Sequence, residues 1–231
     1  MHPSIHHPEK IPLEQFDFAR QSKAMNPNLA EENLQTIRTL MERSALYRRA
    51  LAPIMLMAGG MGLLAAAAGV YFRIEAVRPF AALWLSTASL VVAGSFLLAR
   101  RQAFKDSEPF WSPPTYRVAQ ALLPPLVCGL FVGVMLFLIN ADVSLSLFAV
   151  LLWLLLYGCA LHSAGFFMAR GIKWLGWVFI ACAILFALIT YAMRWEGGPL
   201  AAHWVMGIFF GGLHVAYGIY LYFTEKKNPA A

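Results

Sequence analysis

Two histidines and three glycines share one face of the last apolar run of the chain, Pro199–Phe223. Steps of four, four, three and four residues separate them, which is the spacing of a single helix face, and they are His203, Gly207, Gly211, His214 and Gly218. A GxxxG pair lets a second helix approach closely, so we predict Gly207, Gly211 and Gly218 to be helix-packing positions. Polar side chains are costly inside a membrane, and each histidine is therefore a candidate for function.

A second stripe of this kind lies in the run Val143–Met168, where Gly158, His162 and Gly165 follow helical spacing. The two runs cross in the same direction, and His162 and His214 occupy similar relative positions along them. We therefore expect the two imidazoles at similar depth. The sequence leaves open whether their rings face each other.

Three roles are open for the histidines. In the first, each ring hydrogen-bonds a carbonyl, hydroxyl or tyrosine of a packed bundle. In the second, His162 and His214 are axial ligands of haem b, because imidazoles from facing helices hold haem in helical bundles. In the third, a proton-linked or ligand-binding cavity is lined by Tyr157, His162, His203, His214 and Tyr217.

Catalysis is not predicted. No Asp or Glu accompanies the histidines inside the apolar runs, and the chain has no GxSxG, HExxH or P-loop pattern. The cysteines Cys128, Cys159 and Cys182 lie in separate runs without a CxxC spacing, so neither a disulfide framework nor a metal site is predicted. We expect no catalytic residues, no metal and, outside the haem alternative, no cofactor.

Six apolar runs position these residues. The 231-residue chain is 60% hydrophobic and only 13% charged, and its apolar residues gather in blocks of membrane-spanning length. Backbone groups in lipid must satisfy one another, so each block is predicted to be a helix, and the fold class is an all-α polytopic membrane protein. The expected spans are Ala50–Phe72, Pro79–Ala99, Tyr116–Ile139, Val143–Met168, Ile172–Met193 and Pro199–Phe223.

The remaining segments flank this transmembrane domain, residues 50–223. Residues 1–27 are predicted to be a flexible cytoplasmic tail, because repeated prolines interrupt any helix there. Residues 28–49 are predicted to be an amphipathic helix capped by Asn28, which lies at the lipid headgroups or docks on a cytoplasmic partner or a second copy. Residues 224–231 form a cytoplasmic C-terminal tail.

The lysines and arginines orient the bundle. Seven precede the first span, four lie in the 100–117 loop, two in the 169–173 turn and two at the C-terminus, whereas the opposite side holds Arg73, Arg78 and Arg194. The positive-inside rule places both termini in the cytoplasm, in agreement with an even number of crossings. We therefore predict a multi-pass membrane protein in contact with the lipid bilayer. No basic patch with interleaved aromatics accompanies the net charge of +6, so direct nucleic-acid binding is not predicted.

Two segments resemble an uncharacterised family of bacterial six-helix integral membrane proteins: EENLQTIRTLMERSALYRRALAP, which enters the first span, and LHVAYGIYLYF, which ends the last. The resemblance covers the chain from about residue 28 onward. Genes of that family often lie beside a gene for a winged-helix transcriptional regulator. The resemblance brings no catalytic residues. It implies a location in the bacterial inner membrane. It also implies a regulatory pairing, in which the membrane protein senses a signal and the soluble neighbour controls transcription.

The leading hypothesis is a non-enzymatic sensory or regulatory membrane protein that meets a cytoplasmic regulatory protein through residues 28–49. The first alternative is a small transporter or channel-like protein with a cavity near His162 and His214. The second is a haem-binding electron-transfer subunit that uses the same two histidines. The glycine-rich first span indicates tight packing, within the monomer, which we favour, or across a homo-oligomer.

Overall fold

The computed structural model describes residues 27–107, 109–139, 142–195 and 197–226. It divides into two units, Met1–Arg43 and Ser44–Ala231, and the first contributes the helical backbone of residues 27–43. Helix α2 comprises Pro27–Tyr71 and begins one residue before the predicted cap, since proline suits the first turn of a helix. The predicted tails at 1–27 and 224–231 lie largely outside the described residues.

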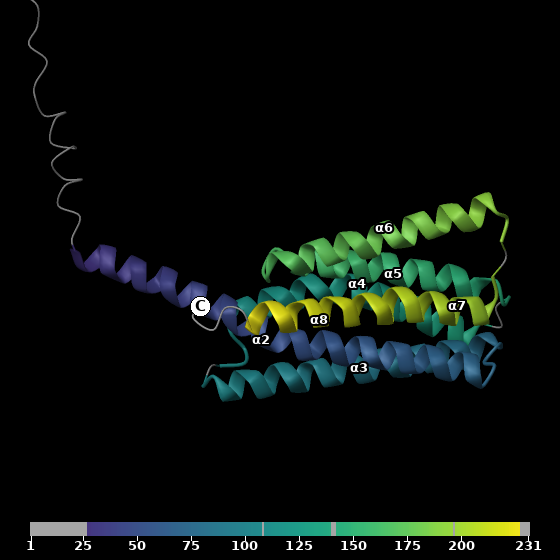
Figure 1. Ribbon diagram of the computed structural model, residues 1–231, viewed down its shortest axis with the longest axis horizontal. Coiled ribbons are helices and arrows are strands. Elements are labelled where there is room, and N and C mark those ends of the chain that lie inside the picture. The colour runs from purple at the N-terminus through teal and green to yellow at the C-terminus, as the bar shows by residue number, and fades with distance from the viewer. Residues whose placement is uncertain (1–26, 108, 140–141, 196, 227–231) are drawn as a thin grey trace, which may run out of the picture. The chain divides into compact units, whose positions relative to one another are not determined.

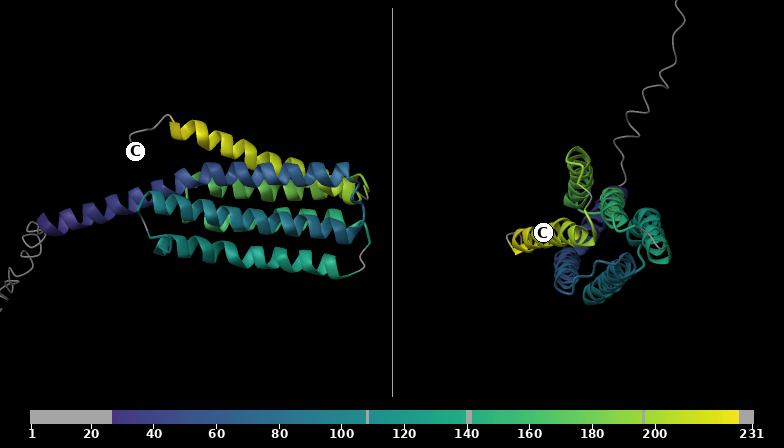
Figure 2. Two further views of the ribbon diagram at one scale, coloured as in Figure 1. Left: turned by 90° about the horizontal axis from the view of Figure 1, so that it is seen from below. Right: turned by 90° about the vertical axis from the view of Figure 1, so that its right-hand side faces the viewer.

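The remaining described helices alternate in direction, except that the last three continue one another along a single crossing (Figure 1, Figure 2). They are α3 (Val77–Lys105), α4 (Pro113–Leu138), α5 (Leu145–Ala164), α6 (Arg170–Ala192), α7 (Pro199–Val205), the π-helical segment η2 (Met206–Gly212) and α8 (Leu213–Lys226). Six segments are long and apolar enough to cross a membrane: Ala50–Tyr71, Val77–Lys105, Thr115–Leu138, Leu145–Ala164, Gly171–Ala192 and Pro199–Thr224. The described chain contains no strand. The predicted all-α architecture with six membrane spans is confirmed.

Some boundaries differ from the predicted ones. Helix α3 continues beyond the predicted end of the span at Ala99 and ends at Lys105. The loop predicted over residues 100–117 is therefore confined to residues 106–112 between α3 and α4. Helix α5 ends at Ala164, before the predicted limit at Met168, and a short turn leads into α6.

Helix α5 contacts α3, α4, α6, α7 and η2. In the view along the helix axes it lies between α4 and α6 (Figure 2). Its buried positions include small residues as well as leucines, and Gly158 is one of them. A side chain at Gly158 would meet the backbone of α6 at Gly176 and Ile180, so α5 and α6 lie in close backbone contact.

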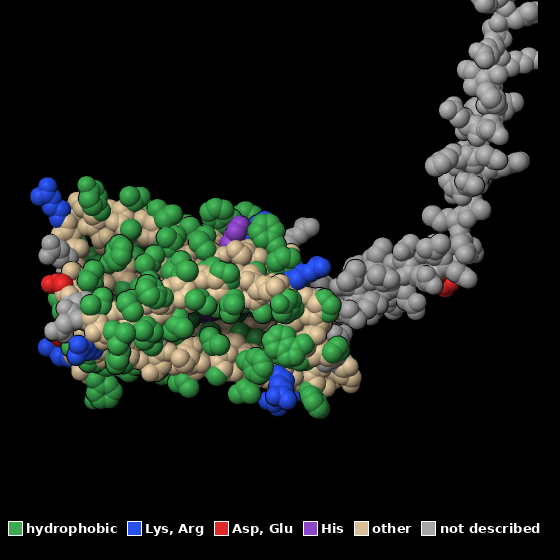
Figure 3. Space-filling view, turned by 180° about the vertical axis from the view of Figure 1, so that it is seen from behind, with side chains coloured by type: hydrophobic (Ala, Val, Ile, Leu, Met, Phe, Trp, Pro, Cys, Tyr) green, Lys and Arg blue, Asp and Glu red, His purple; other side chains and the backbone are tan. Residues whose placement is uncertain are grey.

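On the face that Figure 3 shows, the charged side chains lie at the two ends of the bundle, and hydrophobic side chains are spread over the flank between them. This distribution is that of a protein whose flanks face hydrocarbon. The described basic side chains lie at the end that holds the α3–α4 loop and the α5–α6 turn (Arg100, Arg101, Lys105, Arg117 and Lys173) and at the opposite end (Arg73, Arg78 and Arg194).

Helices α2 and α6 end in the same way. Arg73 and Arg194 both have φ of 49°, the left-handed conformation that terminates many helices. The following N–H groups reach back five residues along the chain, from Ile74 to the Gly69 carbonyl and from Trp195 to the Thr190 carbonyl, each at 2.9 Å. These Schellman motifs satisfy carbonyls that the helix ends leave open.

Asp142 stabilises the turn between α4 and α5. The Ser144 backbone N–H donates to its carboxylate Oδ1 at 2.9 Å, and this hydrogen bond lowers the pKa of the Asp142 side chain. Because the pKa is depressed, the interaction is present above the ordinary carboxyl pKa and is lost as pH falls through the lowered value. Helix α5 accordingly starts at Leu145, two residues after the predicted beginning of the span at Val143.

The first span of α2 packs closely against the last span through glycines on both helices. A Cβ at Gly59 would lie 2.6 Å from the Val215 nitrogen and 2.8 Å from the Gly211 carbonyl oxygen. A Cβ at Gly211 would lie 2.9 Å from the Leu63 nitrogen, and one at Gly218 would lie 3.0 Å from the Leu56 nitrogen. These neighbours are backbone atoms, so glycine is required for the two helices to approach this closely.

We predict that Gly59→Ala lowers the Tm of the detergent-purified protein, because its methyl group forces apart the backbones of α2 and the last span. Overpacking of this kind typically costs about 1–3 kcal/mol. Gly60→Ala is the matched control, since a Cβ at Gly60 has no neighbour within 4 Å. Equal Tm values for the two variants would contradict the close contact.

Candidate functional site

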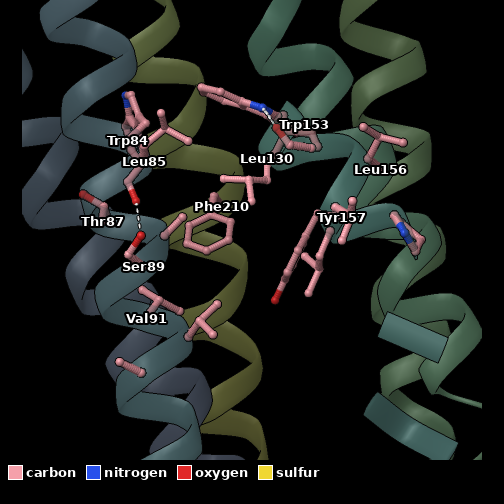
Figure 4. A pocket seen from close by; sticks show the side chains of 18 of the residues that line it. Trp84, Leu85, Thr87, Ser89, Val91, Leu130, Trp153, Leu156, Tyr157 and Phe210 are labelled. Atoms are coloured by element: carbon pink, nitrogen blue, oxygen red, sulfur yellow. Dashed lines mark hydrogen bonds between the residues drawn. The ribbon is translucent and has the colours of Figure 1, made fainter. Parts of the chain in front are cut away.

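A cavity of about 820 Å³ lies among α3, α4, α5 and η2. It is lined from residues 84–97 of α3, 123–130 of α4 and 153–157 of α5, and from Met206 and Phe210 of η2. Trp84, Thr87 and Ser89 stand on one side and Trp153 and Tyr157 on the other, with Phe210 between them (Figure 4). All of the described lining residues are uncharged, and most are apolar.

Most polar groups of the cavity wall are already bound to the backbone. Thr87 Oγ1 donates to the Leu83 carbonyl and Ser89 Oγ donates to the Leu85 carbonyl, both at 2.8 Å. Trp153 Nε1 donates to the Gly129 carbonyl of α4 at 2.9 Å. The wall therefore presents hydrocarbon and aromatic surface, and these three donors are engaged.

His214 is completely buried behind the cavity wall and joins the last span to α5. Its Nδ1 lies 2.7 Å from the Phe210 carbonyl oxygen, and its Nε2 lies 2.7 Å from the Tyr157 hydroxyl oxygen. A carbonyl only accepts hydrogen bonds, so Nδ1 carries the proton. In a neutral ring Nε2 is then the acceptor, and the Tyr157 hydroxyl donates to it.

His203 is also completely buried, and its hydrogen bonds impose the opposite tautomer. Trp84 Nε1 lies 3.1 Å from His203 Nδ1, and His203 Nε2 lies 3.2 Å from the Ile74 carbonyl oxygen. The indole N–H only donates, so Nδ1 is the acceptor and Nε2 carries the proton. Gly69 makes room for the ring, because a Cβ at that position would fall onto it.

His162 lies in a different environment. Its ring packs edge-on against Phe166 and Trp177, with centroid distances of 5.4 and 5.1 Å. Its Nδ1 is buried and has no hydrogen-bond partner among the described residues. Lys173 Nζ lies 3.9 Å from the centroid of Phe166, so this group sits beside the basic α5–α6 turn.

The predicted site residues thus separate into distinct places. Tyr157 lines the cavity, His214 stands behind it, and His203 binds the lining residue Trp84. His162 and Tyr217 are outside the lining, and Tyr217 instead has its ring 6.1 Å from that of Tyr220 and its hydroxyl next to Gly171.

The glycines of the last span and His214 face different neighbours. Residues 206–212 form η2, whose wider turns change the register of the residues that follow. Gly207, Gly211 and Gly218 face α2, whereas His214 faces Tyr157 of α5. Uniform α-helical spacing, on which the prediction rested, does not allow for this change.

The arrangement does not suit haem ligation by His162 and His214. Both ring nitrogens of His214 are engaged by protein groups. The rings that His214 contacts, Tyr157, Phe179 and Phe210, include none of those that His162 contacts. Tyr157 and His162 are five residues apart on α5, about 140° around the helix, so they point in different directions.

Sequence reasoning did not single out Trp84, Trp153 or Phe210. Inside apolar runs these residues are indistinguishable from lipid-facing aromatics. One weak signal was available, since Trp153 and Tyr157 are four residues apart and so share a helix face. The partner of Trp84 is 119 positions away along the chain, which no local pattern indicates.

No family model matches the chain, and no curated protein or solved structure shows significant similarity to it.

We predict that Trp84→Phe lowers the Tm by leaving Nδ1 of the buried His203 without its donor. An unsatisfied buried acceptor typically costs about 1–3 kcal/mol. Trp174→Phe is the control, because Trp174 is 71% exposed on α6. A Tm shift no larger than that of the control would show that the indole–imidazole hydrogen bond is not stabilising.

Proposed function

We propose that the chain is a non-enzymatic, multi-pass membrane protein that binds a lipophilic single-chain molecule between its helices and serves a sensory or regulatory role. The observation that carries this proposal is the apolar cavity of about 820 Å³ among α3, α4, α5 and η2. Its volume falls within the roughly 300–1,000 Å³ of small-molecule sites. Its lining matches a hydrocarbon chain in polarity.

The position of the cavity supports entry from the bilayer. Lining residues on α3 and α4 are also exposed on the flank of the bundle, among them Val92 at 59% and Leu130 at 55%. A molecule dissolved in the membrane can therefore reach the cavity sideways between these helices. Ligands of water-filled sites must instead enter from one end of a bundle.

The same lining favours a binding site over an ion pathway. An ion that crosses the hydrocarbon region needs charged groups, open carbonyls or water along its route. The described lining contains no charged residue, and Thr87, Ser89 and Trp153 donate to backbone carbonyls. The transporter or channel alternative is therefore less well supported than retention of a lipophilic ligand.

Residues 28–49 are the segment that we propose passes the signal on to a cytoplasmic regulatory protein. The amphipathic pattern of this segment and its helical backbone in α2 support the proposal. With both termini in the cytoplasm of a bacterium, as the lysine and arginine distribution favours, this segment meets soluble partners. The resemblance to a family encoded beside winged-helix regulators suggests the class of that partner.

We predict that tritiated hexadecanol binds the detergent-purified protein saturably and that Ala88→Phe reduces this binding at least several-fold. Ala88 lines the cavity on α3, so a phenyl ring there occupies the space that the chain needs. Equilibrium binding at fixed detergent concentration measures the effect.

Ala181→Phe is the matched control, because Ala181 is exposed on α6 and is not among the lining residues. Binding that neither saturates nor differs between the two variants would show that hexadecanol partitions into the detergent shell. The cavity proposal would then be rejected.

We also predict that a winged-helix regulator encoded beside this gene crosslinks to the full chain in cells and that deletion of residues 28–49 abolishes the crosslink. The full chain and the deletion variant should be present in equal amounts in the membrane fractions, which immunoblotting verifies. Undiminished crosslinking after the deletion would remove the proposed role of the segment.

A further inference from the structure

We propose that the cavity selects lipophilic ligands whose head group donates a hydrogen bond, in particular long-chain alcohols, and that the acceptor is the hydroxyl oxygen of Tyr157. This inference rests on the proposed function, because it concerns the ligand of the same cavity. It adds the chemical class of the head group and the atom that recognises it.

The direction of the hydrogen bond between Tyr157 and His214 follows from the Phe210 carbonyl. That carbonyl oxygen lies 2.7 Å from His214 Nδ1 and can only accept, so the ring proton is on Nδ1. A charged ring would need an acidic partner in this buried place, and the ring contacts of His214 are Tyr157, Phe179 and Phe210. The neutral ring therefore offers Nε2 as an acceptor.

Tyr157 must then donate its only hydroxyl proton to His214. The Tyr157 oxygen lies 2.7 Å from Nε2, within the range of a strong O–H···N hydrogen bond. A phenolic oxygen that donates still has lone pairs that accept. Figure 4 shows Tyr157 extending from α5 toward Phe210, with its hydroxyl oxygen at the space between them. Tyr157 thus offers a ligand an acceptor and no donor.

The other polar groups of the wall offer a ligand no free donor. The side-chain donors of Thr87, Ser89 and Trp153 are bound to carbonyls at 2.8, 2.8 and 2.9 Å. Trp84 donates its indole proton to His203 at 3.1 Å. The hydroxyl oxygens of Thr87 and Ser89 keep lone pairs that accept, as the Tyr157 oxygen does. A ligand with a hydroxyl group therefore meets acceptors, whereas an ether, ketone or ester oxygen finds no donor and remains unsatisfied.

The decisive experiment compares hexadecanol with hexadecyl methyl ether, which has the same chain and an oxygen that only accepts. We expect the wild-type protein to bind the alcohol about two- to tenfold more tightly than the ether, in competition with tritiated hexadecanol. Equal affinities would overturn the inference while leaving the proposed function intact. Failure of both molecules to bind would reject the proposed function itself.

Two variants test whether the Tyr157 oxygen causes the preference for the alcohol over the ether. Tyr157→Phe removes the acceptor, and His214→Leu releases the Tyr157 proton so that it can donate to the ether. In each variant we expect the ratio of the two affinities to fall toward one. Tyr220→Phe, at an exposed tyrosine of α8, should retain the wild-type ratio. An unchanged ratio in the folded Tyr157→Phe protein would overturn the assignment of this oxygen.

Discussion

The lack of water inside the hydrocarbon region is the constraint on which the rest of this structure depends. Every buried polar group must find its partner within the protein. His203 and His214 meet this requirement fully, each with one donor and one acceptor contact. In each case one partner can only donate or can only accept a hydrogen bond, and it therefore determines which ring nitrogen carries the proton. Among the described residues, Ser146 Oγ and His162 Nδ1 are buried exceptions.

Close backbone packing and the π-helical segment act together on the last span. Glycines let α2 and this span approach until backbone atoms are neighbours. Phe210, within η2, lines the cavity, and His214, just after η2, faces Tyr157. Segments of this kind often occur at functional sites in membrane and soluble helices alike. Here the segment joins the packing interface to the candidate ligand site.

The chemistry of the cavity follows from the same constraint. Because the wall donors are bound to the protein's own acceptors, the cavity is largely hydrocarbon in character, yet the Tyr157 oxygen remains able to accept. An apolar site with a few accepting hydroxyl oxygens distinguishes ligands by the head group and tolerates variation in the chain. Lateral exposure of its α3 and α4 walls suits a molecule that arrives through the bilayer.

The sequence by itself determined the six spans and their approximate limits, because hydrophobic length and backbone satisfaction in lipid depend on local composition. It also indicated Tyr157, His203 and His214 as residues of interest. Only the tertiary structure decided that His214 binds Tyr157 and that His203 binds Trp84, partners 57 and 119 positions away. The reason is physical: helix rotation and register are set by side-chain packing between distant segments, and a single π-helical turn alters both.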